Sequence, residues 1–461
     1  MKRAGHGWRA LIVLFLAPCA LALGPHEILL LANRNSPDSL ELAREYAALR
    51  HIPTENIIPL DLQANPPLEI SASEFNRLIW EPARKVCRER GLDDHILAWV
   101  YSVDFPIRIT AKPVLSIQGL TFLKGILPAG ELVERGTYTS PLFAGPDSPS
   151  SSGFPPQSFD VQHEWLGNDM PVPSMMLGFM GTAGNSREEI MLCLSKGIRS
   201  DRTMPEGTVC IVTNSDIRSL CRQWEFAPTA RELKALGVTA IITNAYPANA
   251  SQTGEPIGLT GLMTGAADIP EATTGRFHFL PGAVAEHLTS FGAAFDNPCQ
   301  TKITAWIRAG ATASAGTVAE PMSLWPKFPH ARVFAHPLSG CTLIESLYQS
   351  LRCPLQTLII GEPLSSPWGA QSRISFRDLS EGAIVTNRQI ASTEIRAQNG
   401  EIFGRYMFLL DGRTFQPLGK QTSVTLDPAA LSRGRHTLRV VAYRVGSVRC
   451  QIFSEMMFEV K

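Results

Sequence analysis

The sequence predicts an α/β fold followed by a smaller all-β domain. Short apolar runs alternate with stretches of helical periodicity up to residue 361, which is the pattern of a parallel sheet flanked by helices. From about residue 373, short strands with turn residues replace the helical pattern, as in an immunoglobulin-like β-sandwich. With 461 residues, 44% hydrophobic and 18% charged, the chain has the length and composition of two or three packed domains.

The first part of the chain supplies three predicted strands. Residues 26–33 (HEILLLAN) are apolar and of strand length, and Ser36-Pro37-Asp38-Ser39 then provides a helix start. Residues 40–49 carry apolar residues at helical spacing. Further strands are predicted at 56–62 and 95–103, on either side of a helical stretch at 71–90. This alternation indicates a parallel sheet with helices packed on it.

A Pro/Ser/Gly-rich stretch at 144–157 interrupts the alternation and predicts a mobile loop. The rhythm then resumes, with strands predicted at 208–214, 238–244 and 357–361 and a helix at 229–236. Near the end, strands are predicted at 405–410, 436–443 and 451–460, and Asp411-Gly412 signals a hairpin. The expected organisation is a signal peptide (1–22), two α/β subdomains (23–145 and 158–368) and a β-sandwich (373–461).

The N-terminus has the anatomy of a secretory signal peptide. Basic residues precede an apolar run at 10–23, and residues 20–22 (ALA) form a small-x-small cleavage site. The run is short for a membrane span, so we expect none after cleavage; an uncleaved anchor is the alternative. Lipidation at Cys19 is a second alternative, although Pro18 fits it poorly. The protein is therefore expected in the periplasm or at the surface of a bacterium.

Charge and cysteine content exclude several classes of function. Lys+Arg and Asp+Glu both number 42 and no basic run occurs, so we expect no nucleic-acid partner. Eight cysteines remain after the predicted cleavage, an even number that permits disulfides, but Cys193 and Cys210 lie in apolar segments typical of buried thiols. No Cys/His spacing suggests zinc, and we expect neither metal nor cofactor. The oligomeric state does not follow from the sequence.

Residues 258–321 are the predicted location of any functional site. Two apolar runs there end in small-residue clusters, at 264–267 and 289–292, and a third cluster covers 310–316. Small residues at strand ends let the backbone approach a ligand or another backbone closely.

His287 and Ser290 are the first catalytic candidates in this stretch. A serine hydroxyl becomes a nucleophile when a base takes its proton, and Asp268 or Glu286 could orient the histidine. Positions three apart point to opposite faces of a strand, so the pair would meet only on a helix or turn. The alternative is that His287 is a partly buried structural histidine and Ser290 a turn residue.

Cys299 and Ser314 are further candidates. Cys299 precedes a predicted helix at 300–308, whose N-terminus would favour a thiolate, whereas nearby Asp296 opposes one. Disulfide pairing is its alternative role. Ser314 sits in a segment similar to a nucleophile elbow, but Thr312 occupies the first glycine position, so strand packing explains it better.

Polar residues follow several predicted strands: Asn33, Asn35, Asp104 and Asn214. Ligands of open α/β sheets bind beyond the carboxyl ends of the strands, so these side chains suggest a polar rim suited to a peptide or a sugar. The alternative is that they cap the helices that follow.

Five segments together resemble an uncharacterised family of exported bacterial proteins from species that carry the exosortase protein-sorting system. They are LLANRNSPDSLELAREYAALRHIPTENIIPLDL (30–62), VYSVDFPIRI (100–109), LPGAVAEHLTSFG (280–292), RAGATASAGTVAEP (308–321) and LIIGEPLSSPWG (358–369). The resemblance covers nearly the whole mature chain. It implies a cell-envelope protein linked to exosortase-type sorting.

The layout is also similar, more distantly, to the gingipain-type cysteine peptidases, which implies a caspase-like α/β fold. In that fold a catalytic histidine follows one strand, and a catalytic cysteine ends the next strand ahead of a helix and a GA-rich strand. Here these places fall near 262–267 and 288–291, which contain neither a histidine nor a cysteine.

Two functions remain open at this point. The first is a non-catalytic or degenerate peptidase-like protein that binds a peptide or an envelope polymer. The alternative is a peptidase-like hydrolase that uses His287 with Ser290 or Cys299.

Overall fold

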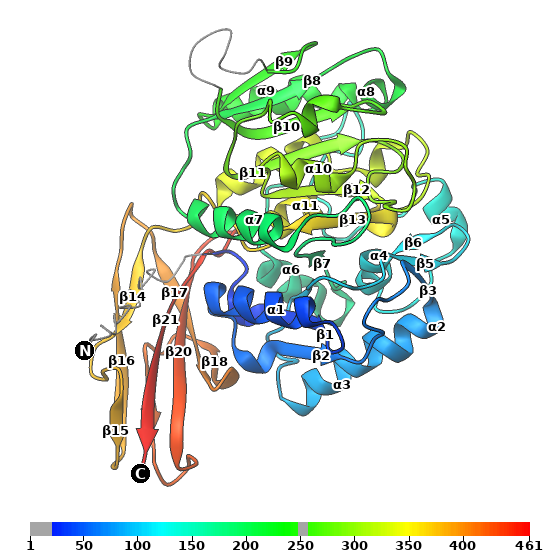
Figure 1. The fold of residues 1–461 in the computed structure, drawn as a ribbon. Coiled ribbons are helices and arrows are strands. Elements are labelled where there is room, and N and C mark those ends of the chain that lie inside the picture. The colour runs from blue at the N-terminus through cyan, green and yellow to red at the C-terminus, as the bar shows by residue number, and fades with distance from the viewer. Residues whose placement is uncertain (1–20, 248–256) are drawn as a thin grey trace, which may run out of the picture.

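Figure 1 shows the computed structural model of the chain, which describes residues 21–247 and 257–461. Residues 1–20, which hold most of the predicted signal peptide, lie outside the described residues. The last two positions of that prediction, Leu21 and Ala22, are buried in the structure. Leu21 pairs antiparallel with Gln451, and each backbone N–H donates to the other residue's carbonyl, at 2.9 and 2.6 Å.

The predicted sheet is present and has ten strands, in the order β2-β1-β4-β7-β13-β12-β11-β10-β8-β9. The first five of these are β2 (Ile57–Leu60), β1 (Ile28–Asn33), β4 (Ala98–Tyr101), β7 (Ser174–Met176) and β13 (Thr357–Gly361). The other five are β12 (Ala313–Thr317), β11 (Phe279–Leu288), β10 (Leu259–Gly265), β8 (Thr208–Val212) and β9 (Thr239–Thr243). Both predicted α/β subdomains therefore contribute to one sheet.

The sheet is mixed, whereas the sequence predicted a parallel one. Each half is parallel within itself, but β12 and β13 pair antiparallel, from Ala313 opposite Gly361 to Thr317 opposite Thr357. Parallel neighbours need a connection that returns the chain to the starting edge of the sheet. Residues 318–356 instead begin and end at one edge, because Thr317 and Thr357 are partners, so β13 runs back beside β12. The carboxyl ends of the two halves consequently lie at opposite edges.

Helices cover both faces of the sheet (Figure 1). On one face lie α1 (Pro37–Arg50), α7 (Arg187–Ser200) and α10 (Ile303–Arg308), with α7 in contact with both of the others. The other face carries α4 (Ile117–Phe122), α6 (Phe159–Leu166), α9 (Phe226–Ala235) and α11 (Leu343–Ser350). The other α-helices of the described residues are α2 (Ala72–Phe75), α3 (Glu81–Glu89), α5 (Gly130–Glu134) and α8 (Ile217–Leu220).

The helix start predicted at residues 36–39 is confirmed. Ser36 is the N-cap of α1, and its hydroxyl accepts the backbone N–H of Ser39 at 3.1 Å. Pro37 occupies the first turn, where a missing N–H costs nothing. A second, small sheet of β3 (Glu69–Ser71), β5 (Arg108–Thr110) and β6 (Leu115–Ser116) lies beside the large one.

Residues 144–157 form no helix or strand, as predicted, but they are tied to the α/β part. One guanidinium nitrogen of Arg332, Nη1, donates to the carbonyls of Ala144 at 2.8 Å and Phe154 at 3.0 Å. The same arginine forms a two-point ion pair with Glu232. The loop is therefore part of the packed structure, where the sequence predicted a mobile excursion.

The C-terminal part is built of two β-sheets with a shared core, in place of the helical pattern, as predicted. One sheet contains β14 (Arg373–Phe376), β16 (Gln389–Arg396) and β19 (Ser423–Leu426). The other contains β15 (Ala383–Val385), β21 (Gln451–Val460), β20 (Gly434–Arg444), β17 (Phe403–Leu410) and β18 (Arg413–Gly419). All pairings are antiparallel except β15 with β21. Asp411 and Gly412 both have positive φ and form the predicted hairpin turn.

All eight cysteines of the described residues are free thiols, so the structure contains none of the disulfides that the even count permits. Cys193 and Cys210 are buried, as predicted from their apolar segments. No helix of the described residues is both long and apolar enough to span a membrane.

Candidate functional site

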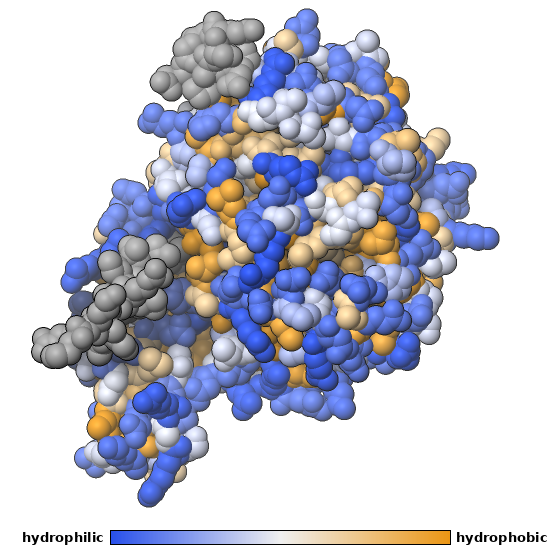
Figure 2. Space-filling model, in the orientation of Figure 1, coloured by the Kyte–Doolittle hydropathy of each residue, from blue (hydrophilic) through white to orange (hydrophobic). Residues whose placement is uncertain are grey.

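A groove of about 490 Å³ lies where β11 and β12 end, and most of its lining residues belong to the stretch 258–321 that the sequence singled out. Its apolar lining residues are Val114, Phe291, Ala294, Pro298, Val318 and Ala319. Its polar lining residues are Glu69, Arg108, Asp296, Asn297 and Glu320. In the view of Figure 2, hydrophilic side chains cover most of the visible face. Hydrophobic side chains are visible mainly in the middle of that face, around α7, α10 and the neighbouring strands.

The small-residue clusters build this groove by letting backbones meet. A Cβ on Gly316 of β12 would lie 3.0 Å from the carbonyl carbon of Gly292 and 2.6 Å from the Ile303 side chain. Ala293 N–H donates to Thr317 O at 3.0 Å across the same contact. The segment that leaves β11 is thus packed directly on β12. Here the small-residue clusters allow one backbone segment to contact another. This was one of the two predicted roles; the other was close approach to a ligand.

Two side chains hold the 289–302 segment in place. The side-chain oxygen of Gln300 accepts from the Thr289 hydroxyl at 2.7 Å and from the Phe291 backbone N–H at 2.9 Å. The ammonium of Lys302 donates to the carbonyls of Phe291 at 2.8 Å and Cys299 at 2.6 Å. One wall of the groove is therefore fixed by hydrogen bonds.

Arg108 joins the two walls. Its Nε donates to Glu69 Oε2 at 2.8 Å, and its Nη1 donates to Asp296 Oδ1 at 2.9 Å. The Arg108 hydrogen bonds hold the pKa of Asp296 below its ordinary value, so this carboxylate is ionised at neutral pH. With Glu320 the lining holds three carboxylates and one arginine, which is already paired. The groove consequently favours a ligand that brings positive charge.

His287 lies near the end of β11 with its side chain buried. Its Nε2 donates to Ala266 O at 2.7 Å, and its ring meets Trp306 edge-on, with 5.7 Å between centroids. Burial lowers the pKa of His287 to about 4, so the ring is neutral at neutral pH. Its Nδ1 is buried and has no hydrogen-bond partner within the described residues.

The structure does not join His287 to the other candidates by a hydrogen bond. Ser290 is half-buried in the turn after β11, where its carbonyl accepts the Thr317 hydroxyl at 2.9 Å. Glu286 points to the opposite face of the strand and pairs with Arg222 at 2.5 Å, so it does not orient His287. Asp268 is exposed and makes no hydrogen bond to the ring.

Cys299 is exposed and follows the groove-lining Pro298. The helix that was predicted to start at residue 300 begins at Ile303 with Lys302 as its N-cap. Cys299 is therefore outside the helix's first turn, and the expected stabilisation of a thiolate by the helix does not operate. Ser314 is fully buried in the middle of β12, opposite Ile360, as strand packing predicts.

The polar residues at strand ends divide between the two edges of the sheet. Asn33 and Asp104 lie at one edge, where the Asn33 amide donates to Asp104 O at 3.1 Å. Asn35 donates to Asp61 at the same edge. Asn214 lies at the other edge and donates to Gly265 O at 2.9 Å. The single rim expected from a parallel sheet is therefore absent from the described residues, because the sheet is mixed.

The sequence did not single out Arg108 or Glu69, and it pointed to Asp296 only for its effect on Cys299. A signal existed, because Arg108 interrupts the apolar run FPIRI and a half-buried arginine needs carboxylates. The partners themselves, Glu69 and Asp296, could only come from the tertiary fold. Within the described residues, no group of three or more His, Cys, Asp or Glu side chains is placed to hold a metal ion.

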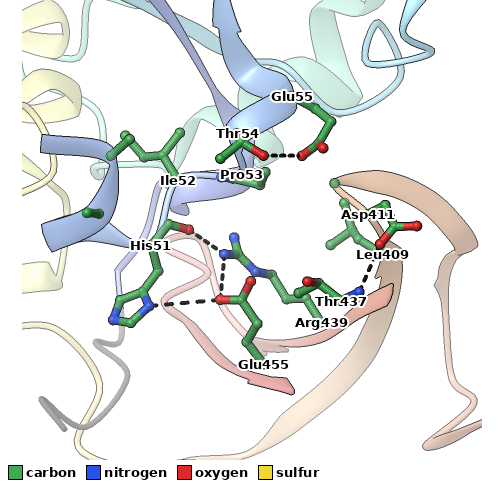
Figure 3. Close-up of a pocket in the computed structure, with 13 residues that line it drawn as sticks. His51, Ile52, Pro53, Thr54, Glu55, Leu409, Asp411, Thr437, Arg439 and Glu455 are labelled. Atoms are coloured by element: carbon green, nitrogen blue, oxygen red, sulfur yellow. Dashed lines mark hydrogen bonds and ion pairs between the residues drawn. The ribbon is translucent and has the colours of Figure 1, made fainter. Parts of the chain in front are cut away.

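A second pocket, of about 260 Å³, lies between the end of α1 and the C-terminal β unit. Figure 3 shows Arg439 of β20 reaching from the β unit toward His51, beside Glu455. The Nη2 atom of Arg439 donates to His51 O and to Glu455 Oε2, the latter at 3.0 Å. The guanidinium also lies 4.9 Å from the Phe453 ring centre. This arrangement joins the two parts of the molecule.

Comparison with known proteins adds little to this geometry. No protein-family model and no curated protein matches the chain. The fibronectin(III)-like modules of Clostridium thermocellum CbhA match at 14% identity and a TM-score of 0.16, covering 19% of this chain and 96% of that chain. The endo-beta-1,4-mannanase from Thermotoga petrophila matches at 11% identity and a TM-score of 0.17, covering 94% of this chain and 79% of the mannanase chain. At these TM-scores neither likeness supports a conclusion about fold or function.

Proposed function

We propose that this chain is an exported, non-catalytic binding protein and that the groove at the ends of β11 and β12 holds a peptide. The observation that carries the proposal is the state of His287, whose ring is buried, neutral and hydrogen-bonded to Ala266 O, while the groove beyond the end of its strand has apolar walls. The unprotonated nitrogen of this ring, Nδ1, is buried, and no serine or cysteine of the described residues is hydrogen-bonded to it, so the ring is not positioned as the base for a nucleophile.

The proposed fold is caspase-like, with an immunoglobulin-like C-terminal unit. The order of β10, β11, α10 and the GA-rich β12, with the three strands adjacent in the sheet, supports the first part. The common core of the two C-terminal sheets supports the second. By the resemblance stated above, the proposed setting is the periplasm or surface of a bacterium, in connection with exosortase-type sorting; an envelope polymer is the other ligand class that this setting offers.

The chemistry of the groove specifies the peptide. Phe291, Val318 and Ala319 provide an apolar wall, while Glu320 and Asp296 provide negative charge. We expect a segment that carries an apolar side chain next to a lysine or arginine.

The test measures binding of fluorescein-labelled hexapeptide pools to the mature protein by fluorescence polarisation. Ala319→Trp fills the groove and should weaken binding at least tenfold, which corresponds to about 1.4 kcal/mol. Glu320→Lys should shift the preference away from basic peptides. Ala430→Trp adds the same side chain at an exposed position of the C-terminal unit and serves as the control. Unchanged binding by Ala319→Trp would overturn the proposal.

A peptidase-like hydrolase is the second candidate, favoured by one observation: Cys299 is exposed directly beside the groove. The assay is turnover of a fluorogenic peptide library by the purified protein. Hydrolysis that disappears in Cys299→Ala or Ser290→Ala, and in His287→Gln, would establish the hydrolase and replace the binding proposal. Fluorophosphonate labelling that is lost in Ser290→Ala would identify the serine as the nucleophile.

A further inference from the structure

A cavity of about 430 Å³ lies between α9 and the Pro/Ser/Gly-rich loop. It shares no lining residue with the peptide groove. Its lining includes Trp224, Glu225, Thr229, Glu232, His330 and Arg332. The volume is that of a small-molecule site.

The indole of Trp224 lines this cavity together with several hydroxyl-bearing side chains. Trp224 packs edge-on against Trp325 at 5.3 Å and against His330 at 5.4 Å between ring centres. These contacts fix the orientation of the indole. Three serines of the loop line the cavity together with it. An aromatic body beside polar tips suits a ligand that has an apolar face and polar edges.

His330 offers an unused hydrogen-bond donor. Its Nδ1 accepts the backbone N–H of Arg332 at 3.1 Å, so the proton of the neutral ring is on Nε2. Nε2 has no hydrogen-bond partner among the described residues, and Glu225 Oε2 is 3.9 Å away, beyond hydrogen-bond reach. The Thr229 hydroxyl also has no partner in the described part of the chain. His330, Glu225 and Thr229 are each 1% exposed.

The buried groups of the cavity are neutral overall. Burial lowers the pKa of His330 to about 3 and raises the pKa of Glu225 to about 8, so both are uncharged at pH 7. The ion pair of Arg332 with Glu232 cancels two further charges. A neutral carboxyl group both donates and accepts hydrogen bonds, as does a threonine hydroxyl. The buried groups therefore offer a strongly charged ligand little to pair with; Arg231, exposed in the lining, is the one lining charge without an ion pair among the described residues.

We propose that this cavity binds a neutral saccharide of one or two rings, with the sugar's C–H face on Trp224 and its hydroxyls on His330, Glu225 and Thr229. A pyranose ring combines an apolar face with hydroxyls that donate and accept. It matches the indole, the Glu225 carboxyl, and the two buried groups, His330 Nε2 and the Thr229 hydroxyl, that have no partner among the described residues. The loop closes the site, because Arg332 fixes both Ala144 and Phe154. The proposal goes beyond peptide binding and does not depend on it.

The test uses the mature protein and four disaccharides: maltose, cellobiose, lactose and N,N′-diacetylchitobiose. Isothermal titration calorimetry should detect saturable one-to-one binding of at least one of them. Trp224→Ala should weaken it at least tenfold. Trp165→Ala removes an indole that is 80% exposed and lies outside the cavity, and should leave it unchanged.

Thr229→Val keeps the side-chain shape and removes only the hydroxyl, so it tests the site in a folded protein; it should weaken binding several-fold. Circular dichroism melts verify the fold of each variant. Ala319→Trp should not affect the saccharide, which separates this proposal from the peptide groove. The proposal is overturned if none of the four sugars binds, which would leave the cavity to water, or if a peptide pool binds there and loses affinity in Trp224→Ala.

Discussion

At the residue scale, His287 illustrates how burial decides the use of a titratable group. A histidine three positions from a serine looks like a catalytic pair in the sequence. In the fold, Trp306 and the Ala266 carbonyl enclose the ring, and its preferred state is neutral. The consequence is a pH dependence of stability that can be measured without knowing any ligand.

We expect His287 to make the protein sensitive to acid. Its pKa is about 4 in the fold against an ordinary value of 6.5, so the unfolded state takes up a proton first. The stabilisation is complete above pH 6.5 and is lost as the pH falls toward 4. At about 1.4 kcal/mol for each pKa unit, the loss is roughly 3 kcal/mol.

Urea unfolding at pH 7.5 and pH 4.5 tests this expectation. His287→Gln keeps an N–H for Ala266 O but cannot titrate, so its stability should fall less between the two pH values than that of the wild type. Equal falls would show that the histidine is not responsible.

The buried ion pair between Arg222 and Glu286 gives a second prediction at this scale. Arg222 also donates to Thr264 O at 2.6 Å, whereas Glu286 has no hydrogen-bond partner within residues 21–247 and 257–461 besides this ion-pair contact. Arg222→Met leaves a buried carboxylate without its counter-ion and should cost about 3–5 kcal/mol in the free energy of unfolding.

The double variant Arg222→Met with Glu286→Leu removes both charges. Its stability, measured by guanidinium denaturation, should recover most of the loss, because replacing a whole buried ion pair by apolar groups is often neutral. A double variant no more stable than the single one would mean that shape, not charge, causes the loss.

At the scale of elements, the contact of the 289–302 segment with β12 sets the position of the groove. A side chain on Gly316 would press on Ile303 and on the Gly292 backbone. Gly316→Ala should therefore lower the free energy of unfolding by about 1–3 kcal/mol and weaken binding of the hexapeptide pools. Denaturation and polarisation assays on the same preparation measure both. Unaltered stability would mean that the segment can move away from β12 at little cost.

Much of the element structure could be predicted from the sequence. Apolar runs identified β1, β8 and β13, and Ser36-Pro37 identified the start of α1. Helix α7 was missed, although Ser186 and Glu189 form a capping box that the sequence displays. The direction of β13 could not be predicted, because it depends on which edge residues 318–356 occupy after folding. The same holds for the groove, where Arg108 and Asp296 are 188 positions apart.

At the scale of the whole molecule, the C-terminal β unit is attached over several contacts. Arg449 pairs with Asp160 at 3.1 Å and Glu164 at 2.7 Å, and buried His26 lies 3.2 Å from the Tyr443 hydroxyl. Leu21 adds the backbone pairing with Gln451. The unit is therefore structurally continuous with the α/β part.

We expect a chain that begins at Leu21 to unfold in one cooperative transition in differential scanning calorimetry. A chain that ends at residue 369 should be insoluble or lack a cooperative transition, because it loses the partners of His26, Leu21 and Asp160. Two separate transitions, or a folded truncated chain, would show that the β unit is independent.

The antiparallel junction at the centre of the sheet has a consequence for the order of folding. Strand β13 separates β7 from β12, so the half that begins the chain lacks its inner edge until residue 361 has been synthesised. Pairings between such distant segments form slowly, and an uncovered inner edge keeps earlier fragments from completing a core. We therefore expect a growing chain of this topology to complete its α/β core only after residue 361 has been synthesised.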